Sequence, residues 1–180
     1  MNKVLLHACC AVCAAYPIEF LRELGYEPVV YFFNPNIYPK DEYERRLLEL
    51  ENYSGKKNVE LIIDETSVSG WYDFIMGFES EPERGKRCSR CFEYRLIFTA
   101  VKALKLGIPT FTTTLTVSPH KDSKVIFDIA EEIAFKHELE FLKIDFKKQN
   151  GYLKTMQIAK SENFYRQNYC GCEFSIIKQK

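Results

Sequence analysis

The sequence predicts an α/β protein: one doubly wound domain with about five parallel strands and helices on both faces of the sheet. The main observation is that strand-like and helix-like segments alternate along the whole chain, which is typical of a parallel sheet. The length of 180 residues and the hydrophobic fraction of 46% suit a single core. No repeat, low-complexity tract or Pro/Gly/Ser-rich linker divides the chain. We therefore expect residues 1–180 to form one HUP/Rossmann-like domain.

The first predicted elements follow from apolar runs and the residues that end them. Residues 4–8, Val-Leu-Leu-His-Ala, are apolar apart from His7 and predict a buried strand. A helix is predicted over residues 11–24, because Gly25 is placed to end it. Residues 29–33 are β-branched or aromatic and predict a second strand, which the turn-forming residues 34–36 end.

The middle of the chain continues the alternation. Residues 41–53 are charged on one side and apolar on the other, which predicts a surface helix, and residues 59–63 predict a third strand. A helix-rich stretch follows over residues 72–106, and Gly107 and Pro109 end it. The last part predicts a strand over 111–116, a helix over 123–137, a strand over 141–144 and a helix over 152–159.

The predicted topology places a ligand site. In open parallel sheets, ligands bind beyond the carboxyl ends of the strands, at the point where the strand order reverses. Cys9 and Cys10 directly follow the first strand, and residues 116–120 follow the fourth strand. If these strands are neighbours across that point, both segments border one site.

Composition and charge exclude several functional classes. Lys and Arg together number 25, as do Asp and Glu, so a nucleic-acid partner would have to be held by a local basic patch. No apolar run approaches the roughly 18 residues needed to cross a bilayer. The chain opens Met-Asn-Lys without an apolar signal segment, so we expect a cytoplasmic protein that does not associate with membranes.

The seven cysteines are the most informative residues, because they fall into three tight groups: Cys9, Cys10 and Cys13; Cys88 and Cys91; Cys170 and Cys172. In a reducing compartment a disulfide scaffold is not expected. Two C-x-x-C motifs at predicted helix starts favour thiolates that bind a metal. An iron–sulfur cluster fits this pattern better than structural zinc or metal-free dithiol chemistry, because a domain of this size needs no zinc to fold. The three alternatives stay open at this point.

The last pair, Cys170 and Cys172, has two interpretations. With one glycine between them, the two thiols form a redox pair that shuttles electrons. Alternatively, they join Cys9 or Cys13 in holding a second metal. Asp64, at the predicted end of the third strand, is an accessory candidate as ligand or proton donor, although a capping role explains it equally well.

Polar and basic residues near these motifs are candidates for binding a substrate or RNA. The segment around the second thiol group is rich in positive charge, which offsets a thiolate-ligated cluster or contacts phosphates. Residues 118–123 form a predicted helix start with free backbone N–H groups, and Tyr169 could stack on a base. The candidates are Arg84, Lys86, Arg87, Arg90, Ser118, His120, Lys121 and Tyr169.

Taken together, the motifs resemble one known family. The segments HACCAVC (residues 7–13), CSRC (88–91) and YRQNYCGC (165–172) occur in the order found in the QueH type of epoxyqueuosine reductase, which is independent of cobalamin. Val12 stands where that family more often has proline. The resemblance implies reduction of the epoxide of epoxyqueuosine, at the wobble position of tRNA, to queuosine. It also implies that an external electron donor supplies two electrons.

The resemblance further implies roles for particular residues. Cys9, Cys10, Cys88 and Cys91 would hold a [4Fe–4S] cluster, and Cys170 with Cys172 would be the redox-active pair. An additional iron ion could lie beside the cluster, with Cys13 as an accessory ligand. We also expect the C-terminal segment, residues 163–180, to fold back onto the site.

Two rival functions remain for the sequence. An ATP-dependent, cluster-containing tRNA-thiolating enzyme would need a Gly/Ser-rich phosphate loop after the first strand, and residues 8–11 contain no glycine. A zinc-binding RNA adaptor would use the same thiols without catalysis. The metal that the protein holds, iron or zinc, would separate the adaptor from the reductase.

Overall fold

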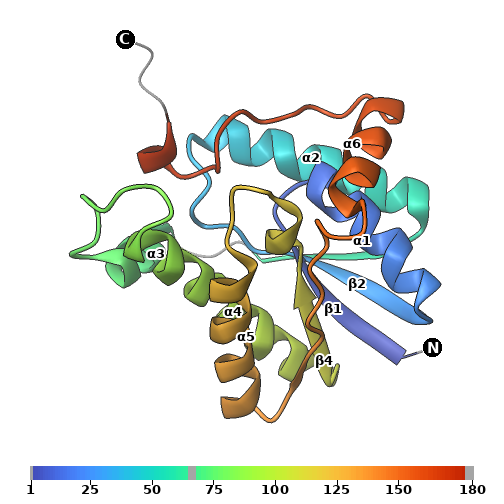
Figure 1. Cartoon of the computed structure of the whole chain (residues 1–180), viewed down its shortest axis with the longest axis horizontal. Coiled ribbons are helices and arrows are strands. Elements are labelled where there is room, and N and C mark those ends of the chain that lie inside the picture. The colour runs from blue at the N-terminus through green and yellow to red at the C-terminus, as the bar shows by residue number, and fades with distance from the viewer. Residues whose placement is uncertain (1, 65–67, 177–180) are drawn as a thin grey trace.

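The computed structural model describes residues 2–64 and 68–176. Five strands form one parallel sheet in the order β3-β2-β1-β4-β5, so the order reverses between β1 (Asn2–Ala8) and β4 (Thr110–Thr113). The register pairs Leu5 with Phe111 and His7 with Thr113. The doubly wound α/β fold and the β1–β4 neighbourhood expected from the sequence are therefore confirmed (Figure 1).

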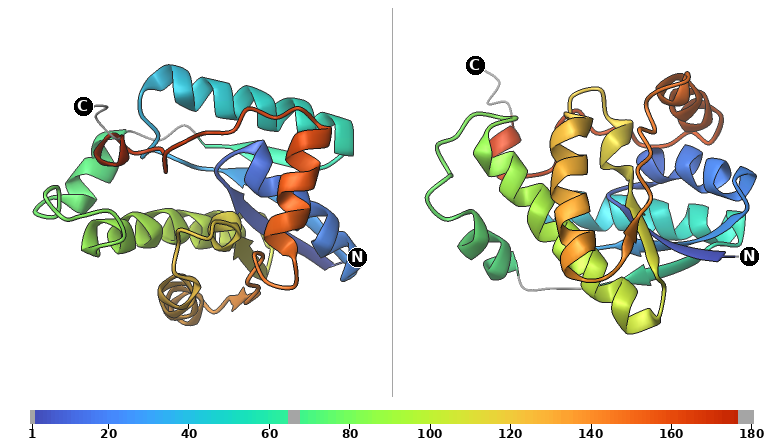
Figure 2. Two further views of the ribbon diagram at one scale, coloured as in Figure 1. Left: turned by 45° about the horizontal axis from the view of Figure 1, so that its top comes forward. Right: turned by 60° about the horizontal axis from the view of Figure 1, so that its bottom comes forward.

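Helices cover both faces of the sheet. The helices α1 (Ala11–Glu23), α2 (Lys40–Lys57) and α6 (Gly151–Ser161) lie on one face. The helices α4 (Lys86–Leu106) and α5 (Ser123–Lys136) lie on the other, and α3 (Val68–Ile75) packs against α4. The left view of Figure 2 shows the sheet between these two layers.

The strands divide the core in two because neighbouring side chains of a strand point to opposite faces. In β1, Leu5 packs with Phe111 and the α4–α5 side, whereas Val4 and Leu6 pack with α1 and α2. Both faces of this central strand are buried from Val4 to Ala8. That burial explains why this part of its sequence is apolar apart from His7 rather than alternating.

Most predicted elements are present with shifted ends. The strands β2 (Tyr26–Phe32) and β3 (Glu60–Ile63) match the prediction within three residues at each end. The predicted helix-rich stretch 72–106 is two helices, α3 and α4, because residues 76–85 are not helical. This connection contains Gly77, Pro82 and Gly85, and backbone at Gly77 has a φ of +84°.

The fourth predicted strand is wrong over residues 114–116. β4 ends at Thr113, and Thr114–Val117 form the 3-10 helix η1. The Thr113 Oγ1 accepts a hydrogen bond from Leu115 N at 3.2 Å. Threonine hydroxyls compete in this way with a sheet ladder, and here the competition turns the chain toward the site.

The fifth predicted strand, 141–144, is also shorter, because β5 covers only Glu140–Phe141. The carbonyl oxygens of Leu142 and Ile144 accept hydrogen bonds from the hydroxyls of Thr112 and Thr116, each at 2.9 Å. Side-chain hydroxyls thus take the place of backbone pairing at this edge.

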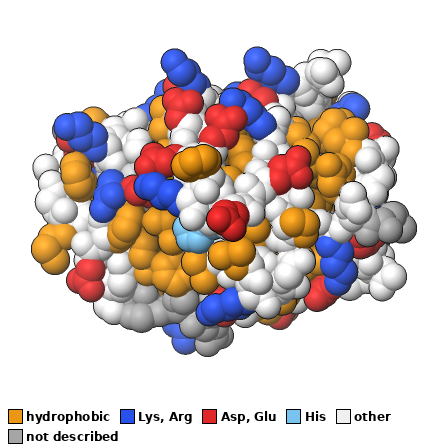
Figure 3. Space-filling model, turned by 90° about the horizontal axis from the view of Figure 1, so that it is seen from below, with side chains coloured by type: hydrophobic (Ala, Val, Ile, Leu, Met, Phe, Trp, Pro, Cys, Tyr) orange, Lys and Arg blue, Asp and Glu red, His pale blue; other side chains and the backbone are white. Residues whose placement is uncertain are grey.

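Two surface properties bear on function. Among the described helices, none combines the length and apolarity required to cross a bilayer. The face seen from below in Figure 3 carries positive and negative side chains interleaved with apolar ones. This mixture gives no reason to place RNA on that face, so the charged residues at the carboxyl ends of the strands are the ones to examine.

Candidate metal centre and substrate cavity

The first thiol group lies where β1 gives way to α1. Cys9 and Cys10 follow the last residue of β1 and are buried, and Cys10 is the N-cap residue of α1. Cys13, one turn into the helix, completes a set whose Sγ atoms all lie within 4.8 Å of one another. The Cys9 and Cys10 sulfurs are 3.8 Å apart. The strand end and the first helical turn therefore aim three sulfurs at one point.

The electrostatics of this triad favour a thiolate. Hydrogen bonds from the Cys10 and Cys13 thiols hold the pKa of Cys9 well below its ordinary value, against the effect of burial. Hydrogen bonds with Cys10 and with Cys9, together with burial, raise the pKa of Cys13. A lowered pKa favours the thiolate form of Cys9, and thiolate is the form that binds a metal.

The second thiol group begins α4. Cys88 is half-buried in the first turn and Cys91 is buried one turn later. The backbone N–H of Arg84 donates to Cys88 Sγ at 3.2 Å. Arg84 has a φ of +70°, a conformation that non-glycine residues rarely adopt. The loop before α4 is thus shaped so that a backbone amide meets the Cys88 sulfur.

The third thiol group reaches the site on the C-terminal segment, which Figure 1 shows running beside α2. Tyr38 N donates to Gly171 O at 2.8 Å, and Gln167 Nε2 donates to Cys10 Sγ at 3.2 Å. Gly171 has a φ of +126°, which only glycine adopts readily. All seven cysteines are free thiols.

A buried ion pair on α2 anchors this segment. Arg46 is 1% exposed, and its Nε donates to Glu42 Oε1 at 2.6 Å. The two terminal nitrogens of Arg46 donate to the carbonyl oxygens of Cys170 (3.3 Å) and Tyr169 (3.4 Å). The Tyr165 hydroxyl donates to the other Glu42 oxygen at 3.0 Å. One guanidinium therefore fixes the backbone beside Cys170.

A second buried arginine lies among the thiols. Arg95 is 2% exposed, and its Nε donates to Cys91 O at 3.2 Å. Its Nη2 has no hydrogen-bond partner in the described residues. Burial opposes its charge, but the negative charges of Cys91 and Cys170 raise the pKa of Arg95. This fixed cation offsets the negative charge that a thiolate-bound metal would bring.

His7, in the strand before the first thiol group, is a structural residue. Burial, and then the charge of Arg95, lower its pKa to about 3, so the ring is neutral. Its Nε2–H donates to Phe33 O at 3.3 Å because a carbonyl only accepts. Nδ1 therefore accepts from the Thr113 hydroxyl at 2.9 Å. Both ring nitrogens hold β1 to its neighbours.

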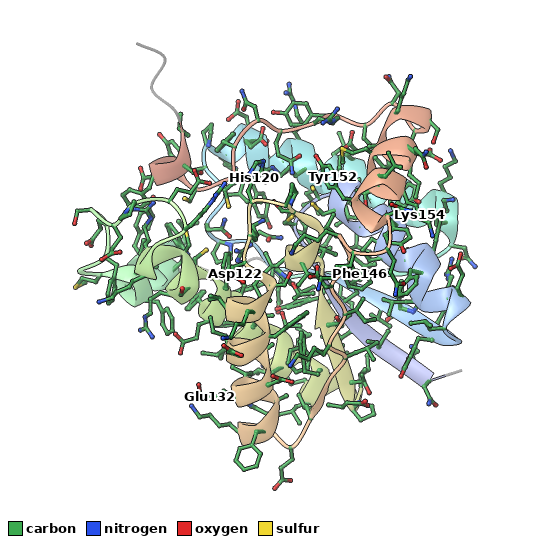
Figure 4. The ribbon with its side chains drawn as sticks, in the orientation of Figure 1. His120, Asp122, Glu132, Phe146, Tyr152 and Lys154 are labelled. Carbon is green, nitrogen blue, oxygen red and sulfur yellow. The ribbon has the colours of Figure 1, made fainter. Side chains whose placement is uncertain are left out.

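One cavity of about 570 Å³ brings the three groups together, since Cys9, Cys13, Cys88 and Cys170 all line it. The volume lies in the range of small-molecule sites, about 300–1,000 Å³. Figure 4 labels His120 and Tyr152, which border the cavity from the loop before α5 and from α6. Residues far apart in sequence thus meet at the switch point of the sheet.

The candidate residues for substrate or RNA divide into two sets. Those that line the cavity are Arg84, Ser118, His120, Lys121 and Tyr169. Lys86, Arg87 and Arg90 do not line it. Arg87 is 3% exposed and donates to the carbonyl oxygens of Glu79 (2.8 Å) and Glu81, and Arg90 Nη1 pairs with Glu93 at 2.7 Å. These two arginines bind their own loop and helix.

Asp64 also lies away from the thiols. Its carboxylate accepts from the Tyr31 hydroxyl at 2.9 Å and pairs with Lys102 at 2.8 Å. It follows β3, which β2 and β1 separate from β4, and it is not among the residues that line the cavity. The structure gives Asp64 a role in joining β2 and β3 to α4.

The donor set fits a metal, and the geometry offers two ways to choose its ligands. Thiolate sulfur is the donor that iron–sulfur clusters and zinc take. Among the described His, Cys, Asp and Glu residues, one set of three or more is tight enough to share an ion: Cys9, Cys10 and Cys13. Cys88 lines the same cavity, and Cys91 follows it one helical turn later, but both lie outside that set. The ligands are therefore either that triad or the four cysteines Cys9, Cys10, Cys88 and Cys91. Cys9 and Cys10 belong to both sets.

Three contributors were missed by the sequence predictions. Arg46 and Gln167 contact the thiol segments, and Arg166 lines the cavity. The sequence does not indicate that Arg46 is buried, because it lies in a charged helix where arginine usually faces water. Arg166 and Gln167 lie inside the third motif, so their proximity to Cys170 was the available signal.

The fold and the site define a class: a doubly wound α/β protein with a thiol-lined, metal-competent cavity at its switch point. A family model described as epoxyqueuosine reductase QueH matches residues 4–178. The chain belongs to the epoxyqueuosine reductase QueH family, which confirms the resemblance expected from its motifs. This membership favours neither the thiolating enzyme nor the zinc adaptor.

Individual relatives carry the name of the same family. A protein of Streptococcus pyogenes serotype M1 named epoxyqueuosine reductase QueH is 38% identical, over 98% of this chain and 71% of the relative. Its namesake in Thermotoga maritima is 33% identical, over 100% of this chain and 93% of the relative. The crystal structure of a predicted subunit of tRNA methyltransferase from Methanocaldococcus jannaschii has a TM-score of 0.62 at 10% identity, covering 93% of this chain and 94% of that one. That likeness concerns the fold alone.

Proposed function

We propose that this protein is an iron–sulfur epoxyqueuosine reductase, an oxidoreductase that removes the epoxide oxygen of epoxyqueuosine in tRNA and yields queuosine. The observation that carries the proposal is the cavity in which all three thiol motifs of the family meet. The reaction breaks two C–O bonds, forms one C=C bond and releases water. It consumes two electrons and two protons, and the electrons come from an external donor in the cytoplasm.

The proposed cofactor is a [4Fe–4S] cluster held by Cys9, Cys10, Cys88 and Cys91, with Cys13 available to an additional iron ion. The lowered pKa of Cys9 supports thiolate ligation at the first motif. At the second motif burial raises the pKa of Cys88, and the hydrogen bond from the backbone amide of Arg84 opposes that shift. When bound, such a cluster supplies single electrons to a substrate in the cavity. The buried cation of Arg95 stabilises the negative charge of the bound state.

The protein itself binds and encloses the modified base. Arg84, Lys121 and Arg166 line the cavity and supply positive charge toward an RNA backbone in an otherwise neutral protein. Residues 163–176 belong to the proposed C-terminal cover of residues 163–180, of which 177–180 lie outside the described residues. Tyr169 would stack on a base at the cavity mouth.

Cys170 and Cys172 are proposed as the redox-active pair rather than as cluster ligands. Cys170→Ser and Cys172→Ser are therefore expected to abolish multiple turnover, because the second electron store is lost, while cluster absorbance persists. Turnover and the visible spectrum of anaerobically prepared protein measure the two effects. Bleaching of the chromophore in these variants would instead make Cys170 and Cys172 cluster ligands.

The decisive experiment for the function uses the anaerobically purified full chain, tRNA that carries epoxyqueuosine, and dithionite as reductant. We expect nucleoside mass analysis to show loss of one oxygen atom from the modified base. The matched control is tRNA that already carries queuosine, whose mass stays unchanged. A protein loaded with iron that leaves the epoxide intact would overturn the assignment, and a zinc-loaded colourless protein would favour an adaptor.

A further inference from the structure

The reaction needs a proton donor in the cavity, and the position of Lys121 singles it out. Lys121 lies between η1 and α5, and its side chain lines the cavity together with Cys9, Cys13 and Cys170. Its backbone is held on both sides: Lys121 N donates to Ser118 O at 3.2 Å, and Lys147 Nζ donates to Lys121 O at 3.4 Å. The segment is thus fixed at the cavity that the thiols also line.

The ammonium group of Lys121 is uncommitted. Among the described residues, it forms neither a hydrogen bond nor an ion pair, and the adjacent carboxylate of Asp122 instead accepts from Lys124 N at 2.8 Å. Burial opposes its charge, but the negative charges of Cys170 and Cys9 raise the pKa of Lys121. As an ammonium, the group has three N–H bonds to offer a substrate.

Three other proton-bearing groups near the cavity have protein partners. His7 is neutral and uses both ring nitrogens. Nδ1 of His120 is 3.0 Å from Arg84 Nη2 and accepts from it, since a guanidinium only donates. The Tyr169 hydroxyl donates to Tyr38 O. Lys121 differs from these three in carrying an ammonium group, which forms no hydrogen bond among the described residues and lines the cavity together with Cys9 and Cys170.

We propose that Lys121 is the catalytic acid of the deoxygenation, an inference that rests on the proposed function. Its ammonium hydrogen-bonds to the epoxide oxygen and transfers one proton to it as the first C–O bond breaks. Two electrons from the external one-electron reductant and a second proton from water complete the change. The oxygen leaves as water when the second C–O bond breaks and the C=C bond forms, and solvent then reprotonates the amine.

The test combines Lys121→Ala with added amines. We expect the single-turnover rate to fall by about 10²–10⁴-fold, the range that general acid catalysis contributes. Ethylamine should restore part of the rate, because it brings a transferable proton into the vacated space. Tetramethylammonium carries the charge without a proton and should restore nothing. Lys121→Met keeps the side chain's length and should be as slow as Lys121→Ala.

Controls separate this role from folding, metal loading and RNA binding. Lys124→Ala, a nearby exposed lysine of α5, should retain the wild-type rate. Cluster absorbance and tRNA affinity of Lys121→Ala should stay within about threefold of wild type, because the ammonium contacts the epoxide oxygen and the phosphate contacts that dominate RNA affinity are kept.

Two results would overturn the assignment of Lys121 while leaving the proposed function intact: a Lys121→Ala rate equal to that of wild type, or equal rescue by tetramethylammonium. Loss of the cluster in Lys121→Ala and Lys121→Met would likewise replace the acid role by a structural one. If the wild-type protein itself fails to convert the epoxide, the proposed function fails, and the role of Lys121 with it.

Discussion

Cys9→Ser and Cys10→Ser are each expected to remove the metal centre. Both sulfurs belong to the tight triad and to the proposed cluster ligands, so each substitution removes a ligand whichever of the two sets holds the metal. Bound iron should fall by well over tenfold, because even the loss of a partner outside the ligand sphere costs about 10–100-fold in metal affinity. Iron and sulfide content, with the visible spectrum, of protein reconstituted under anaerobic conditions measure the effect.

Cys13→Ser and Cys88→Ser provide the comparison that decides the ligand set. With the cluster on Cys9, Cys10, Cys88 and Cys91, Cys88→Ser should bleach the chromophore and Cys13→Ser should keep it. The reverse outcome would show that the triad of Cys9, Cys10 and Cys13 holds the metal. Retention of full iron content in Cys9→Ser would contradict a metal centre at the end of β1.

Arg46→Met is expected to lower the free energy of unfolding by about 3–5 kcal/mol, the cost of breaking a buried ion pair from one side. The variant leaves the Glu42 carboxylate, 8% exposed, without its cation. It also removes two donors from the carbonyl oxygens of Tyr169 and Cys170. Urea denaturation followed by circular dichroism measures the stability. Faster alkylation of Cys170 in the folded protein would report release of the C-terminal segment.

The matched control is Arg45→Met, on the same helix. Arg45 is exposed and lies 4.5 Å from the centre of the Tyr165 ring, a contact that contributes about 0.5–1 kcal/mol at exposed sites. Equal stabilities of Arg45→Met and Arg46→Met would contradict the anchoring role of the buried pair. The double variant Glu42→Gln/Arg46→Met should recover part of the lost stability, because no unpaired buried charge remains.

The errors in the predicted elements have a common cause. The strand predicted over 111–116 ends early because the Thr113 hydroxyl caps η1, and β5 is short because hydroxyls of Thr112 and Thr116 satisfy its neighbours' carbonyl groups. Threonine is enriched in strands, so a sequence pattern predicts a strand whether its hydroxyl bonds to a neighbour or not. For Thr112 and Thr116, the partner of the hydroxyl lies in a segment some 30 residues away, and no local pattern contains that information.

The sequence by itself determined the class of fold, the strand end that carries Cys9 and Cys10, and the family. These depend on apolar periodicity and on motif spacing, which are properties of neighbouring residues. The tertiary structure decided that Arg87 is buried in its own loop, that Arg46 anchors Cys170, and that Lys121 faces the thiols with its ammonium uncommitted. The physical reason is that the burial and partners of a long charged side chain are set by whichever distant surface packs against it.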